Sequence, residues 1–156
     1  METPPSMQAE LDAWNNGKGI ELEMWVGCEG RFALAVGYAT IFWPEFEVIE
    51  GFIVRKGSSA DAVRDFASQP GTSRLSAERT MNHIHLVDLH YRGCPDATSD
   101  KLLVLGTALK EIYEAKLKWQ FPDRPCSVQL YVPEDAGALD EYELIFWQTA
   151  HENVNA

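Results

Sequence analysis

The sequence predicts an α+β fold in a single domain that spans residues 1–156. The length suits one domain of ordinary size, and no internal repeat or linker rich in Pro, Gly and Ser divides the chain. Segments with strand-like alternation come in groups, rather than strictly between helices. We therefore expect an antiparallel or mixed sheet of about five or six strands, with two or three helices packed mainly on one face.

In the N-terminal third of the chain, the sequence predicts a flexible start at residues 1–7, where Pro4 and Pro5 disfavour regular structure. Two predicted strands follow. Residues 20–26 alternate between apolar and mostly polar side chains, which is typical of a strand with one covered face. Residues 32–43 form a nearly continuous apolar run. We favour a strand there, because Gly37 would cost a helix about 1 kcal/mol relative to Ala. A helix stays open as the alternative, since periodicity alone cannot assign a short apolar run.

The middle of the chain predicts a strand, two helices and another strand. Residues 46–54 are rich in Phe, Val and Ile, as strands are. Ser58–Asp61 has the composition of an N-terminal helix cap, and a weakly marked second helix covers residues 72–81. Residues 83–91 carry apolar side chains at both parities. We expect this segment to be a strand near the middle of the sheet, because both of its faces would be covered.

The C-terminal third predicts one long helix and a strand hairpin. The helix has Ser99 or Thr98 as its cap and Asp100 in its first turn, and it ends near Trp119. Its predicted buried stripe consists of Leu102, Leu105, Leu109 and Ile112. Residues 126–132 and 142–148 are predicted strands joined by a short acidic loop, so we expect them to pair antiparallel.

Charge narrows the class of partner. The chain has 13 Lys and Arg against 24 Asp and Glu, a net charge of −11. Nucleic-acid binding needs clustered basic side chains, and the acidic balance favours a basic protein partner instead. The longest nearly uncharged stretch, residues 32–44, is too short to cross a bilayer as a helix, so we expect no membrane partner. Three cysteines without a CxxC pair predict a reducing, cytoplasmic location.

A candidate metal site lies in the predicted strand at residues 83–91. His83 and His85 are two residues apart, so a strand would direct both imidazoles to the same face. Two imidazoles, a carboxylate and a water can form a catalytic zinc site. The third ligand could be Glu78, Asp88 or Asp96, and no spacing rule selects one of them. The alternative is that both rings are half-buried at a strand end and hydrogen-bonded to backbone groups or to Glu78. Apart from such an ion we expect no cofactor.

Cys94 is a candidate nucleophile. It follows Arg92 and lies four residues after His90, and a neighbouring cation stabilises a thiolate. The alternative is an incidental thiol that packs as a small apolar side chain.

Two tryptophans suggest a protein interface. Trp25 and Trp147 fall on the less apolar sides of their predicted strands, beside carboxylates, where an exposed indole could anchor a basic or amphipathic partner. The acidic loop at residues 134–141 could steer the same partner. The residues that we expect in this interface are Trp25, Glu21, Glu23, Trp147, Glu134 and Asp135.

The sequence therefore favours a non-catalytic protein-binding module, similar in role to an inhibitor or an adaptor, for a basic or amphipathic partner. The first alternative is a metal-dependent hydrolase that uses His83 and His85. The second is a small-molecule-binding protein with an aromatic pocket formed by Tyr38, Trp43 and Trp119. No nucleotide-binding or hydrolase motif is present in the sequence to favour an enzyme.

Overall fold

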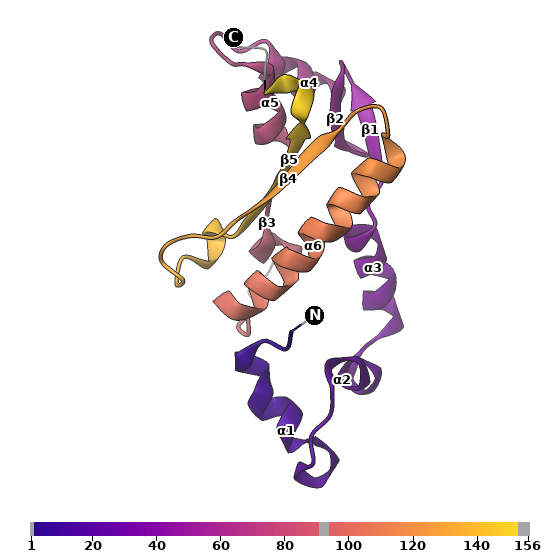
Figure 1. Cartoon of the computed structure of the whole chain (residues 1–156), viewed down its shortest axis with the longest axis vertical. Coiled ribbons are helices and arrows are strands. Elements are labelled where there is room, and N and C mark those ends of the chain that lie inside the picture. Colours follow the sequence, from indigo (N-terminus) through magenta and orange to yellow (C-terminus); the bar gives the residue numbers. More distant parts are fainter. Residues whose placement is uncertain (1, 91–93, 153–156) are drawn as a thin grey trace.

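The computed structural model describes residues 2–90 and 94–152 (Figure 1). The fold is α+β, as predicted, but its strands form two antiparallel sheets rather than one. The first sheet is the hairpin of β1 (Phe46–Ile49) and β2 (Phe52–Arg55). The second has the order β3-β5-β4, and its strands are β3 (His83–His85), β4 (Cys126–Tyr131) and β5 (Glu143–Gln148).

Six α-helices lie within the described residues, so the expectation of two or three was wrong. They are α1 (Gln8–Gly17), α2 (Leu22–Glu29), α3 (Phe32–Phe42), α4 (Ala60–Ala67), α5 (Arg74–Met81) and α6 (Ser99–Gln120). Four short 3-10 helices complete the described elements, namely η1 (Pro5–Met7), η2 (Leu86–Leu89), η3 (Leu139–Glu141) and η4 (Thr149–His151). None of the helices in the described part of the chain is both long and apolar enough for a bilayer span.

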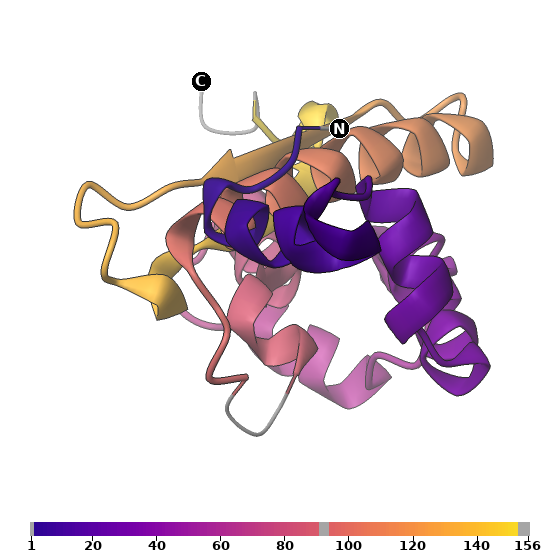
Figure 2. The ribbon, with the colours of Figure 1, turned by 90° about the horizontal axis from the view of Figure 1, so that it is seen from below.

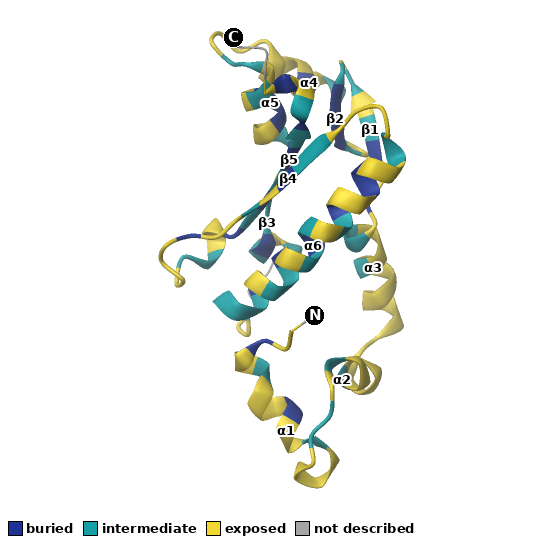
Figure 3. Cartoon of the chain, viewed as in Figure 1, coloured by how far each residue is buried: buried dark blue, intermediate teal, exposed yellow. Residues whose placement is uncertain are grey.

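The long helix and the C-terminal hairpin match the prediction closely. Helix α6 runs across the strands β4 and β5, and the apolar core lies between them (Figures 1 and 3). Gly106 allows the close approach, because a Cβ there would lie 2.6 Å from Cδ1 of Leu130. In β5, every second residue is buried and directed toward this core, as the period of two predicted. The buried core residues are Phe46, Ile53, Leu86, Leu102, Leu109, Tyr113, Leu117, Val128, Tyr142, Leu144 and Phe146.

The two strands predicted at residues 20–26 and 32–43 are helices. Helices α2 and α3 occupy these segments, and neither lies beside a sheet (Figures 1 and 2). A strand needs a neighbour for its backbone hydrogen bonds, whereas a helix satisfies its own. With no strand available as a neighbour, Ala33, Ala35 and Ala39 favour the helix strongly enough to outweigh Gly37.

Two other predicted strands are shorter than expected. Residues 46–54 contain a turn, in which Glu50 and Gly51 both have positive φ, so the segment folds into the β1–β2 hairpin. Strand β3 ends at His85, which is paired with Glu143, the first residue of β5; one more backbone hydrogen bond joins Leu86 to Tyr142. The chain then enters η2. Strand β3 is at the sheet edge, not in its middle, and residue 91 of the predicted strand lies outside the described residues.

A buried carboxylate from α5 joins the two sheets. Glu78 is completely buried and accepts four hydrogen bonds. Its Oε1 accepts from the backbone N–H of Ile53 in β2 at 3.0 Å and from Nε2 of Gln148 at 2.8 Å. Its Oε2 accepts from the backbone N–H of Gln148 in β5 at 2.9 Å and from Nδ1 of His151 at 2.6 Å. Strands β2 and β5 form no hydrogen-bond ladder with each other, and the carboxylate of Glu78 connects them instead.

The start of α6 is tied to the N-terminal segment. Oδ2 of Asp100 accepts a hydrogen bond of 2.7 Å from the backbone N–H of Ser6, and Oδ1 accepts one from the hydroxyl of Thr98. These bonds, that of Thr98 foremost, lower the pKa of Asp100 from 3.8 to about 2.

We expect Glu78→Gln to destabilise the fold by about 2–5 kcal/mol, because an amide cannot accept from four donors and leaves two of them unsatisfied in the core. The free energy of unfolding in urea measures this loss. The control is Glu114→Gln on α6, which removes an exposed ion pair with Lys110 and should change the stability by less than about 0.5 kcal/mol. Equal effects of the two substitutions would contradict the role given to Glu78.

The Asp100 contacts should depend on pH. The pKa is lower in the folded state, so the stabilisation is complete above the ordinary value of 3.8 and is lost as the pH falls through about 2. In an NMR titration, we expect the Ser6 amide signal to move over this acidic range in the wild type. It should not move there in Asp100→Asn, which has no titrating group at this position. The same transition in both proteins would show that another group is responsible.

Candidate functional site

Five exposed large apolar side chains lie on α2, α3 or the two residues between them, which together are called the α2–α3 arm (residues 22–42). They are Met24, Val26, Phe32, Leu34 and Val36. No residue of either helix is buried, and both are coloured almost entirely as exposed or intermediate in Figure 3. Phe32 is 92% exposed, Val36 70% and Met24 61%. The arm therefore presents side chains of the kind that normally fill a core.

The arm is held to the rest of the molecule mainly at its C-terminal end. Tyr38 donates to or accepts from Nε2 of His90 at 2.6 Å. Just beyond α3, the ring of Trp43 lies 6.1 Å from that of Trp119, and the buried ammonium of Lys116 lies within 5.0 Å of both ring centroids. The N-terminal half of α3 has no such contacts, because residues 32–37 are all exposed.

The predicted interface residues do not form one surface. Glu21 and Glu23 are exposed at the start of the arm, and Trp25 lies beside them, but it is half-buried and its Nε1 donates to Glu10 at 3.0 Å. Because α2 is a helix, the strand alternation that was to expose Trp25 does not exist. Trp147 is on β5, a strand that lies far from α2 along the molecule's long axis in Figure 1.

The indole of Trp147 already contacts other side chains of the same chain. It is on the half-exposed side of β5, as the alternation predicted. The guanidinium of Arg79 lies 4.8 Å from its ring centroid, and its Nε1 donates to Glu152 at 2.6 Å. Glu134 and Asp135 are exposed in the loop between β4 and β5, which projects away from α2 and α3 in Figure 1.

His83 and His85 lie close together, with ring centroids 5.1 Å apart. Each Nδ1 contacts a backbone carbonyl: that of Thr80 for His83, at 2.5 Å, and that of Asp140 for His85, at 2.7 Å. No group of three potential metal ligands occurs among the described residues. Glu78, one proposed third ligand, uses all its acceptor positions inside the core. Metal binding by the two histidines stays a prediction.

Tyr38, His90 and Cys94 line a common cavity of about 260 Å³ between the end of α3, η2 and the start of α6. Burial raises the pKa of Tyr38, and the nearby Cys94 and Asp96 add to the effect. Trp43 and Trp119 do not line this cavity, so the three aromatics of the predicted small-molecule pocket are separated. Arg92, the cation expected to activate Cys94, lies outside the described residues.

Sequence reasoning missed the chain of polar contacts through Glu78. Nδ1 of His151 donates to Glu78, and Nε2 accepts from Nε of Arg74 at 3.2 Å. A carboxylate that orients a histidine is familiar from general-base catalysis. Here the second ring nitrogen is occupied and the ring is only 8% exposed, so the histidine is a structural link. No local sequence pattern could reveal it, since the residues are more than 70 positions apart.

The thiols of Cys28 and Cys126 should differ in reactivity. Cys28 is exposed on α2, whereas burial raises the pKa of Cys126 to about 12, with a contribution from the carboxylate of Glu78. At pH 8 only about one Cys126 in 10⁴ is then a thiolate, the reactive form. We expect iodoacetamide to modify Cys28 at least about 100-fold faster than Cys126, as measured by peptide mass spectrometry. In urea the difference should vanish; similar rates in the folded protein would contradict the partial burial of Cys126.

The predicted site residues thus lie in separate parts of the described structure. These parts are the α2–α3 arm, the histidine pair, the cavity beside Tyr38, the acidic loop between β4 and β5, and Trp147 on β5. Comparisons of the chain with protein-family models, with curated proteins and with solved structures give no match.

Proposed function

We propose that the protein is a non-catalytic protein-binding module whose α2–α3 arm binds a basic, amphipathic helix of a partner protein. The observation that carries the proposal is the exposure of Phe32, Leu34 and Val36 on a helix with no buried residue. Large exposed apolar patches are rare on isolated soluble proteins and mark interaction surfaces. Covering one such side chain contributes about 1.5–3 kcal/mol, so a partner that covers several gains substantial affinity.

Charge around the arm favours a basic partner. Glu21, Glu23 and Glu29 are exposed at α2, and Arg31 is the single basic side chain between residues 20 and 43. Carboxylates at the edge of an apolar patch attract Lys and Arg, and they select against acidic competitors. A second copy of this chain carries the same net charge of −11 and would be repelled. A basic helix with one apolar face matches both features of the arm.

The proposed surface keeps part of the interface predicted from the sequence. Glu21 and Glu23 belong to it. Trp25 is placed at its edge, where the hydrogen bond to Glu10 links the arm to α1. Trp147, Glu134 and Asp135 lie elsewhere in the fold and are left out of the proposed surface.

The proposal predicts that Phe32→Ser/Val36→Ser weakens binding of a synthetic helical peptide with Leu on one face and Lys on the other. These two residues are one helical turn apart, so they lie on the same side of α3. We expect the Kd to rise about tenfold or more, because two apolar contacts are lost while the charge is unchanged. Fluorescence anisotropy of the labelled peptide measures the Kd, and raising the salt concentration should weaken wild-type binding.

The matched control is Tyr131→Ser/Val132→Ser, which removes two exposed apolar side chains at the C-terminal end of β4 and should leave the Kd unchanged within about twofold. Equal losses in both double variants, or binding that is insensitive to salt, would refute the proposal. Sedimentation equilibrium without peptide provides a further check. A dimer that dissociates on Phe32→Ser/Val36→Ser would assign the arm to self-association instead.

A further inference from the structure

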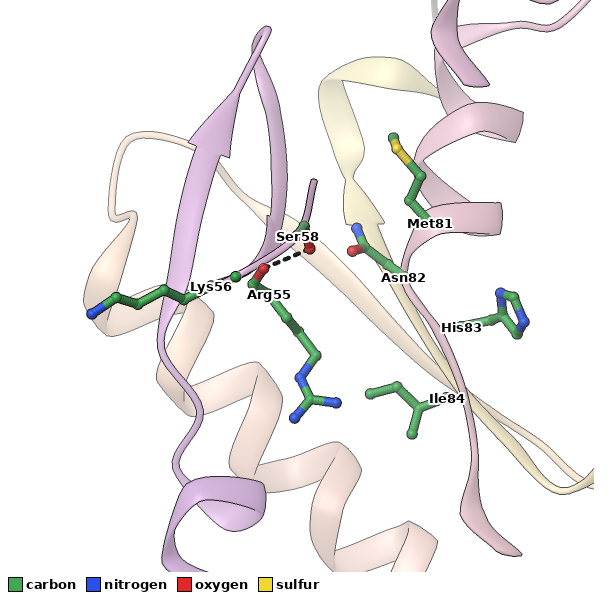
Figure 4. A pocket seen from close by; sticks show the side chains of 8 residues that line it. Arg55, Lys56, Ser58, Met81, Asn82, His83 and Ile84 are labelled. Atoms are coloured by element: carbon green, nitrogen blue, oxygen red, sulfur yellow. Dashed lines mark hydrogen bonds between the residues drawn. The ribbon is translucent and has the colours of Figure 1, made fainter. Parts of the chain in front are cut away.

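A second feature lies apart from the arm, where the end of β2 faces the junction of α5 and β3. Arg55–Ser58 on one side and Met81–Ile84 on the other line an open pocket of about 340 Å³ (Figure 4). This is the volume of about eleven water molecules, which suffices for a small organic molecule.

Arg55 supplies the pocket with a positively charged side chain that forms no ion pair among the described residues. It is half-buried at the end of β2, and its guanidinium has no carboxylate or carbonyl partner within residues 2–90 and 94–152. Figure 4 shows the guanidinium extending into the pocket, close to Ile84. The neighbouring Lys56 points away from the pocket and pairs with Glu45. An arginine fork with free donors binds carboxylates in a bidentate manner.

Asn82 supplies an unpaired acceptor. Its side chain is 2% exposed, and Nδ2 donates to the backbone carbonyl of Ile53 at 2.8 Å. Oδ1 has no hydrogen-bond partner among the described residues. Figure 4 shows the amide at the inner side of the pocket, facing Ser58. Buried acceptors without a donor are rare in folded proteins, and Asn82 is one of the residues that line the pocket.

We propose that this pocket binds a small 2-hydroxy carboxylate. The carboxylate would pair with the Arg55 guanidinium, and the hydroxyl would donate to Oδ1 of Asn82. The half-buried side chains of Met81 and Ile84 provide contacts for a short aliphatic chain. The inference is independent of the partner proposed for the arm, because the two sites share no residue.

Four compounds of one shape test the assignment of each group by calorimetry. The full probe is 2-hydroxy-4-methylpentanoate. The second probe, 4-methylpentanoate, lacks the hydroxyl, and the third, 2-hydroxy-4-methylpentanamide, lacks the charge. The fourth, 4-methylpentanamide, lacks both. We expect the full probe to bind wild-type protein about tenfold more tightly than either single deletion, and the last compound not to bind.

Protein variants test Arg55 directly. We expect Arg55→Gln to weaken binding of the full probe about tenfold or more, and Lys56→Gln, which removes the same charge next to the pocket, to change it less than about twofold. Arg55→Lys keeps the charge but lacks the fork, so it should also bind more weakly.

The inference is overturned if the full probe fails to bind at about 10 mM, if removal of its hydroxyl has no effect, or if Lys56→Gln weakens binding as much as Arg55→Gln. The comparison of the four compounds uses only wild-type protein, so it decides the question even if a variant does not fold.

Discussion

The buried carboxylate of Glu78 is the interaction on which the rest of the structure depends. Strands β2 and β5 belong to different sheets, yet both direct a backbone N–H at this one side chain. An ionised carboxylate can accept about four hydrogen bonds and donates none, so it suits a position surrounded by donors. The cost of burying its charge is offset because every acceptor position is used. Helix α5 thereby connects two sheets that share no ladder.

The charge of Glu78 is further compensated through His151. Nδ1 of His151 donates to the carboxylate, and Nε2 accepts from the guanidinium of Arg74. The imidazole therefore connects the buried carboxylate to a positively charged side chain that is exposed at the surface. The same guanidinium lies 4.1 Å from the ring centroid of Phe52 and donates to the backbone carbonyl of Glu50. The β1–β2 hairpin, α5 and η4 are therefore held by one connected polar network.

The same helix shapes the pocket beside Arg55. Asn82 follows Glu78 by four residues, so both project from one side of the end of α5, and both bind Ile53. Because Nδ2 of Asn82 is used by Ile53, its Oδ1 is the side-chain atom without a hydrogen-bond partner among the described residues. The arm and the pocket have opposite chemistry, since the arm combines apolar side chains with carboxylates and the pocket presents a free guanidinium. Two different ligands, a basic helix and a small anion, would suit them.

The sequence by itself determined the helices and strands in which the spacing of apolar residues matches the side that the fold buries. Helix α6, the capped helix α4 and the β4–β5 hairpin were predicted nearly to their ends, and the close approach of His83 to His85 follows from the period of two. Only the tertiary structure decided residues 20–43, because their alternation fits a strand that finds no neighbour to pair with. It also decided the role of Glu78, whose donors come from positions 25 to 73 residues away. Hydrogen bonds between such distant residues exist only once the chain has folded, so no spacing in the sequence encodes them.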